Sequence, residues 1–153
     1  MAVDFTVVMP VRQRFGDEKP EDLGVGLETD APFVGRQKDY PFQCPNVDPS
    51  QPAILLFQSQ GVVLQLPMTI NGQIVHGGIP SSVDRAADSL GTFLAATWKG
   101  NVMLVTPGVL TENNVLHIES KVLVTGTFDS FIVDNIVVIF KTRSGVTPPL
   151  GRK

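Results

Sequence analysis

The sequence predicts an all-β fold, an antiparallel two-sheet sandwich that is preceded by a long irregular N-terminal arm. Between residues 53 and 142, short apolar and β-branched segments alternate with turn signals about every 8–12 residues, a spacing typical of sandwiches and barrels. Only residues 81–91 offer a plausible helical turn, with a serine as N-cap. The length of 153 residues suits one domain.

The first 52 residues are predicted to form the arm, because they hold seven of the twelve prolines. Proline fixes φ and removes a backbone donor, so this density disfavours long helices and central strands. Aromatic residues nevertheless recur through the arm, which is unlike a disordered chain. We expect Phe15, Phe33 and Phe42 to anchor it, either on its own domain or on a neighbouring subunit.

The β-sandwich domain is predicted over residues 53–142. Its first run, AILLF at 53–57, is continuously apolar, as in a strand that is buried on both faces. The segment TINGQIV contains Asn71-Gly72, which predicts a tight hairpin turn with positive φ.

The two longest predicted strands are 114–124 and 131–140, and residues 143–153 are predicted to be a C-terminal tail. Alternation along the strands predicts which side chains form the core. The predicted core residues are Ile54, Leu56, Val63, Ile70, Leu94, Met103, Val105, Leu116, Ile118, Ile136 and Val138.

Composition excludes several classes of function. A formal net charge of −3 gives no basic footprint for nucleic acid. The single cysteine, Cys44, allows no intrachain disulfide, and no stretch approaches the length of a membrane span. The N-terminus lacks the basic and apolar regions of a signal peptide. We therefore expect a protein of the cytoplasm, or one incorporated into a particle.

Several motifs of residues 53–142 occur in an order seen in a known family: TINGQIV, then ATWKGNVMLV, TPGVL, ENNVLHIES and DSFIVDNIVVIF. This order resembles the galactose-binding-like jelly rolls, which include many carbohydrate-binding modules. The resemblance implies a jelly-roll topology. It also implies that Trp98 is a candidate for stacking on a sugar ring, with Asn71 and His76 as polar neighbours, although large aromatics also serve as core residues.

Asp134 lies within the apolar run FIVDNIVVIF and is predicted to share one face with Ile132, Ile136 and Val138. The resemblance implies a structural calcium ion at such an aspartate. The alternatives are a carboxylate that accepts hydrogen bonds from a loop or from the arm, and an edge position that faces water.

The sequence contains no catalytic constellation, and no cofactor is expected apart from that calcium ion. Two functions remain open as hypotheses. The first is a non-enzymatic interaction module, a structural or assembly subunit of a phage-like, virion-like or secretion-like particle, which forms a homo- or hetero-oligomer through its arm. The alternative is a carbohydrate-binding module or lectin that binds a glycan through an exposed aromatic.

Overall fold

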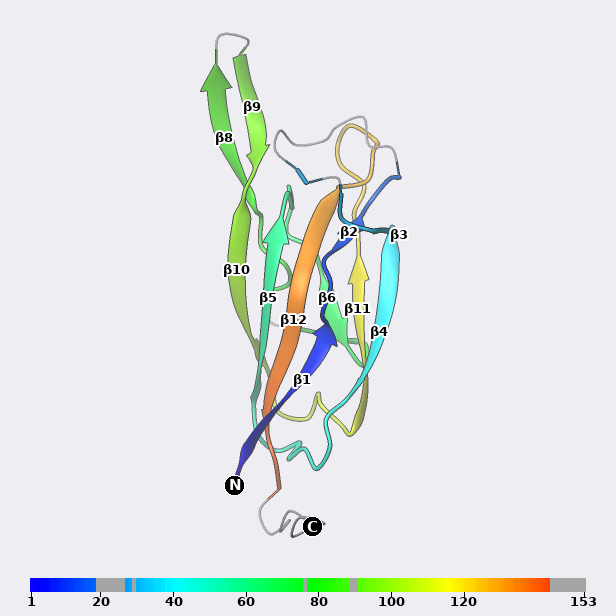
Figure 1. Cartoon of the computed structure of the whole chain (residues 1–153), viewed down its shortest axis with the longest axis vertical. Helices are drawn as coiled ribbons and strands as arrows, with labels where there is room; N and C mark the ends of the chain where they lie inside the picture. The colour runs from blue at the N-terminus through cyan, green and yellow to red at the C-terminus, as the bar shows by residue number, and fades with distance from the viewer. Residues whose placement is uncertain (19–26, 29, 76, 89–90, 144–153) are drawn as a thin grey trace.

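The computed structural model describes residues 1–18, 27–28, 30–75, 77–88 and 91–143. Within these ranges the protein is all-β, with twelve strands and no helix, in a β-sandwich-like arrangement (Figure 1). The described residues accordingly include no helix that is long and apolar enough to cross a membrane.

The larger of the two main sheets has the strand order β10-β5-β12-β2-β3, and β1 also pairs with β12. All of its pairs are antiparallel except β2 with β3, which are parallel. The strands are β1 (Val3–Met9), β2 (Gln13–Phe15), β3 (Phe33–Gly35), β5 (Ala53–Gln60), β10 (Trp98–Val105) and β12 (Phe131–Lys141).

The second sheet has the order β4-β11-β6-β7 and is antiparallel throughout. Its strands are β4 (Gln37–Gln43), β6 (Met68–Ile70), β7 (Gln73–Ile74) and β11 (Asn113–Glu119). Figure 1 shows this sheet behind the larger one, and the buried side chains of both form one continuous core.

A separate antiparallel hairpin consists of β8 (Val83–Asp88) and β9 (Gly91–Ala96), and it projects beyond the two sheets in Figure 1. The helical turn predicted at 81–91 is therefore wrong. The serine that was read as an N-cap has another role, because the Ser82 hydroxyl accepts a hydrogen bond from the Val62 amide at 2.9 Å. Short helical patterns are easily overridden by pairing with a neighbouring strand.

The N-terminal segment also differs from its prediction, because β1 to β4 place it in both sheets rather than in an irregular arm. Its prolines occupy positions that strands tolerate. Pro10 lies between β1 and β2, Pro32 directly precedes β3, and Pro41 lies in β4, an edge strand that pairs only with β11. The prolines of this segment therefore lie at strand ends and in an edge strand, and their density does not indicate an irregular arm.

The core prediction is confirmed for β6, β10, β11 and the second half of β12, where Ile70, Met103, Leu116 and Val138 are buried. It is wrong for β5, where Ile54 is 41% exposed while its neighbours on the other face, Leu55 and Phe57, are buried. Further predicted core residues outside the buried set are Leu56, Val63 and Leu94. A continuous apolar run does not reveal which of its two faces turns inward.

A β-bulge in β12 explains a second difference. The register with β5 shifts between Asp134 and Val137, and Asn135 has a φ of 56°. The extra residue switches the faces of the strand, so Val133 and Ile136 both point into the core. Asp134 consequently does not share a face with Ile136 and Val138, in contrast to the prediction.

The hairpin turn at Asn71-Gly72 is confirmed. The two residues connect β6 to β7 and have φ values of 53° and 77°, as a type I′ turn requires. Glycine adopts this conformation at little cost, and asparagine tolerates it better than most residues.

Candidate functional site

The most distinctive surface of the protein is the outer face of the larger sheet. Residues that are paired across neighbouring strands point to the same side of a sheet, so the registers define rows of side chains. Two such rows cross β10, β5, β12 and β1 and contain only apolar residues. They are Val102–Leu56–Val137–Val7 and Leu104–Ile54–Ile139–Phe5, and we call these eight residues the apolar face.

The apolar face is open to solvent. Val102 is 72% exposed, Phe5 63% and Leu104 51%, whereas the alternate residues of the same strands, such as Met103 and Leu55, are buried in the core. Phe5, Val7, Ile54, Val102 and Leu104 are exposed, and Leu56, Val137 and Ile139 between them are half-buried. Together they form one contiguous patch on the order of several hundred Å², the size of the largest apolar patch of a monomeric protein. Patches of this size mark sites where another surface binds.

The outer face of the second sheet has the opposite character. Its central side chain, His117, pairs with two carboxylates, Asp39 at 2.6 Å and Glu119 at 3.1 Å. The hydrogen bond to Asp39 is the main reason why the pKa of His117 is raised above its usual value. Ile74 and Val115 are also exposed on this sheet, but a charged, hydrated centre is typical of a sheet that faces water. Among the described residues, apolar rows that cross four strands occur on the larger sheet.

A polar cluster borders the apolar face at one end. Arg12 contacts the carboxylates of Glu28 and Asp134, the latter at 3.4 Å, and its guanidinium lies 5.1 Å from the centre of the Trp98 ring. The Trp98 indole donates a hydrogen bond to Glu28 at 3.1 Å. Each charged group of the cluster thus has a partner within it.

This cluster decides how two predicted sites are interpreted. Trp98 is 37% exposed, but Arg12 covers one side of its ring and Glu28 takes its N–H, so the indole is only partly free to stack on a sugar. The carboxylate of Asp134 faces the guanidinium of Arg12. A cation beside this oxygen does not fit a calcium ligand, and no group of three or more metal-ligating side chains occurs in the described residues.

Asn71 has a structural role in the hairpin. Its side-chain amide donates to the Val109 carbonyl and to Asn114, both at 2.9 Å, and its side-chain oxygen accepts from the Val115 amide. These bonds occupy the groups with which Asn71 was expected to bind a ligand. His76 lies outside the described residues.

The three predicted anchors of the N-terminal segment lie on this chain. Phe15 is fully buried and stacks on Phe131 with ring centroids 5.1 Å apart, and Phe42 belongs to the same core. Phe33 is half-buried beneath the guanidinium of Arg14, 4.8 Å from its ring. The aromatic residue of this segment that remains open to another molecule is Phe5, which the sequence did not single out.

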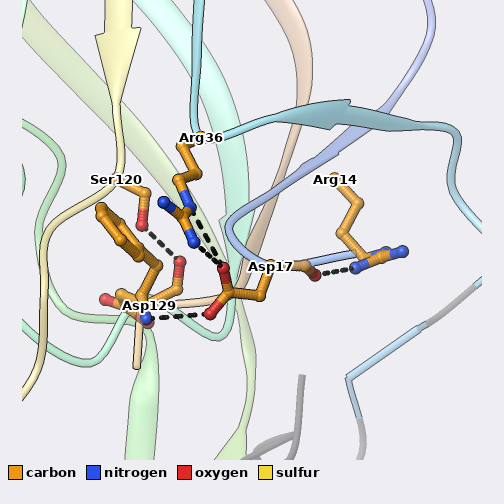
Figure 2. A network of polar contacts seen from close by, with 6 residues as sticks. Arg14, Asp17, Arg36, Ser120 and Asp129 are labelled. Carbon is orange, nitrogen blue, oxygen red and sulfur yellow. Dashed lines mark hydrogen bonds and ion pairs between the residues drawn. The ribbon is translucent and has the colours of Figure 1, made fainter. Parts of the chain in front are cut away.

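A polar network fastens the N-terminal segment to the loop that precedes β12 (Figure 2). The Asp17 carboxylate accepts hydrogen bonds from Arg36, at 2.9 and 3.1 Å, and from the Phe128 amide, at 3.1 Å. The bond from Phe128 is the main reason why the pKa of Asp17 is lowered. This network adds to the strand pairing of β2 with β12 and of β4 with β11, which places these segments in the fold.

Asp129, in the same loop, is a buried carboxylate that deserves comparison with catalytic acids. Its Oδ2 accepts from the Val63 amide at 2.9 Å, and its Oδ1 has no hydrogen-bond partner in the described structure. Burial raises its pKa to about 6. A perturbed carboxylate can indicate an active site, but Asp129 is 1% exposed and its bonds hold the loop at 63–64, which indicates a structural role.

In comparisons with known proteins, no protein-family model matches this chain, and no curated protein matches its sequence. The fold and the surface described above therefore carry the functional argument.

Proposed function

We propose that this protein is a non-enzymatic interaction module, a structural or assembly subunit that joins a larger complex through the apolar face of its larger sheet. The observation that carries the proposal is that three strands, β5, β10 and β12, are apolar on both sides, while the second sheet covers only one side. Continuous apolar strands are typical of sheets with both faces covered. A partner would supply the missing layer.

The proposal differs from the sequence-based hypothesis in the docking element. The predicted anchors Phe15 and Phe42 are buried in the core of this chain, so the contact is assigned instead to the sheet face that includes Phe5 and Val7 of β1. A jelly-roll topology of the galactose-binding-like type, and incorporation into a phage-like, virion-like or secretion-like particle, remain part of the proposal. The sandwich-like architecture and the composition are compatible with both.

The proposal is tested by retention on a hydrophobic-interaction column. Loaded at a concentration low enough to leave the face uncovered by self-association, the wild-type chain should be retained. The double variant Val102→Lys with Leu104→Lys should elute early, because the charges interrupt both rows of the apolar face. The control is Val115→Lys, a valine that is 42% exposed on the other sheet. Equal retention of the wild type and the double variant would overturn the proposal.

The carbohydrate-binding hypothesis is examined with the same proteins. A glycan screen of the wild type and of Trp98→Ala would reveal a lectin as binding that disappears in the variant. Such binding, together with a wild-type chain that the hydrophobic column does not retain, would replace the assembly proposal with the carbohydrate-binding one.

A further inference from the structure

We infer that the occupant of the apolar face is a second copy of this chain, which packs sheet against sheet in a face-to-face dimer. This inference rests on the proposed function and names its partner. It starts from the area of the face. A stable interface of standard size needs about 800 Å² from each partner. The apolar face supplies on the order of several hundred Å², and its apolar neighbour Val3, 66% exposed in the row beyond Phe5, extends it towards that value.

The charge distribution favours an identical partner over a charged one. Neither row of the apolar face contains an ionisable side chain, and the next row, beyond Phe5, pairs Val3 with Lys141. At the border, Arg12 is already paired with Glu28 and Asp134, so its positive charge is balanced within the chain. Protein pairs that recognise each other through electrostatic complementarity need unbalanced charges of opposite sign on the two sides. The eight neutral residues of the apolar face can instead meet their own copy, with Lys141 left at the edge of the contact.

The shape of the face supports the same conclusion. Four adjacent strands, β10, β5, β12 and β1, form one layer, and no other described element packs over their outer side (Figure 1). Two such layers can pack with their strands roughly aligned, about 10 Å apart, as the two sheets of a sandwich do. In an isologous dimer the same patch serves both partners, so one surface is sufficient.

The test is sedimentation velocity of the full chain from about 1 to 200 µM, because interfaces near the lower end of the size range dissociate in the micromolar region. The mass should rise from that of a 16.5-kDa monomer towards twice that value. Val102→Lys should raise the Kd of the dimer at least tenfold, because each substitution is present twice in a two-fold symmetric interface. The Val102→Lys, Leu104→Lys double variant should remain monomeric, whereas Val115→Lys should dimerise like the wild type.

The outcomes separate this inference from the proposed function. A wild-type chain that stays monomeric throughout but is retained on the hydrophobic column overturns the homodimer and leaves an interaction face for another protein. A dimer that survives the double substitution overturns the assignment of this face. Circular dichroism of each variant confirms that the sandwich is intact, which the exposure of Val102 and Leu104 leads us to expect.

Discussion

At the scale of single residues, the buried carboxylate of Asp129 links the stability of the fold to pH. Its pKa is raised from 3.8 to about 6, because burial disfavours the charged form. Between about pH 4 and pH 6 the folded state binds more protons than the unfolded state. The contribution of Asp129 to stability therefore falls as the pH rises through this window, by on the order of 3 kcal/mol in total.

This coupling predicts a pH-dependent gain in stability for Asp129→Asn, which retains an oxygen for the Val63 amide but carries no charge. Urea unfolding of the wild type and the variant at pH 4, 5, 6 and 7 measures it. The advantage of the variant should increase from pH 4 to pH 6 and then level off. Asp17 and Asp48, whose pKa values are lowered, change stability with pH in the opposite direction to Asp129. Their contributions cancel in the difference between the unfolding free energies of the variant and the wild type. A difference that stays constant across the range would contradict the raised pKa.

Gly72 provides a second residue-scale prediction. Gly72→Val should lower the free energy of unfolding by roughly 1–2 kcal/mol, because a β-branched residue is strained at a φ of 77°. A Cβ at this position would meet no atom within 4 Å, so backbone strain alone produces the loss. Gly100 is the matched control, with open space around it but no positive φ. Equal melting temperatures of Gly72→Val and Gly100→Val would refute the strain.

At the scale of elements, the sequence was sufficient for strands that have clear boundaries. The Asn71-Gly72 turn and most of β12 follow from local chemistry and alternation. The strand predicted at 114–124 exists as β11 but ends at Glu119, five residues earlier than predicted. The prediction was wrong where long-range pairing decides the outcome. Strands β1, β2 and β4 obtain partners from β11 and β12, far along the chain, and β3 joins the sheet only through β2. Proline content, a local property, could not reveal those partners.

The candidate surface was only partly predictable for a related reason. The run AILLF was predicted to be buried on both faces, but Ile54 on its outer face is 41% exposed. A sequence does not show whether its own chain supplies both covering layers. The alternation of Val3, Phe5 and Val7 in VDFTVVM is a strand signal that identifies the fourth strand of the apolar face. The bulge at Asn135, which moves Asp134 away from Ile136, leaves no comparable signal in the residue pattern.

The integration of β1 leads to a prediction at this scale. Removing residues 1–9 should lower the free energy of unfolding by at least about 2 kcal/mol, because Met9 is 2% exposed and loses its place in the core. Urea unfolding measures the loss. Phe5→Lys is the control, since an exposed substitution should change stability by less than about 0.5 kcal/mol. A truncated chain that is as stable as the wild type would show that β1 is dispensable.

A longer deletion has a related consequence. Removing residues 1–40 takes away β1, β2, β3 and half of β4, and with them Phe15 and Tyr40 of the core. Had these residues formed an irregular arm outside the sandwich, as the sequence predicted, the sandwich would survive this deletion. The strand pairing now leads us to expect loss of the fold.

At the scale of the whole molecule, the two sheets have outer faces of different chemical character. The second sheet exposes the ion pairs of His117, and the larger sheet exposes the apolar face. The side chains packed between the two sheets stabilise the fold. The proposed association uses the outer side of the larger sheet. Successive residues of a strand point to opposite sides of the sheet. Substitutions in a single strand can therefore test stability and association separately.

Strand β10 permits that separation, because buried Met103 lies between exposed Val102 and Leu104. Met103→Ala should lower the free energy of unfolding by about 2–5 kcal/mol through the cavity that it leaves, while the dimer persists under conditions where the variant is folded. The Val102→Lys, Leu104→Lys variant should do the reverse, with stability measured on the monomer changing by less than about 1 kcal/mol and association lost. Urea unfolding at a concentration well below the dimer range gives the first quantity, and sedimentation gives the second. Two results would contradict this separation: loss of association in a fully folded Met103→Ala protein, or unfolding of the monomer by the double substitution. Either result would show that the inner and outer faces of β10 do not act independently.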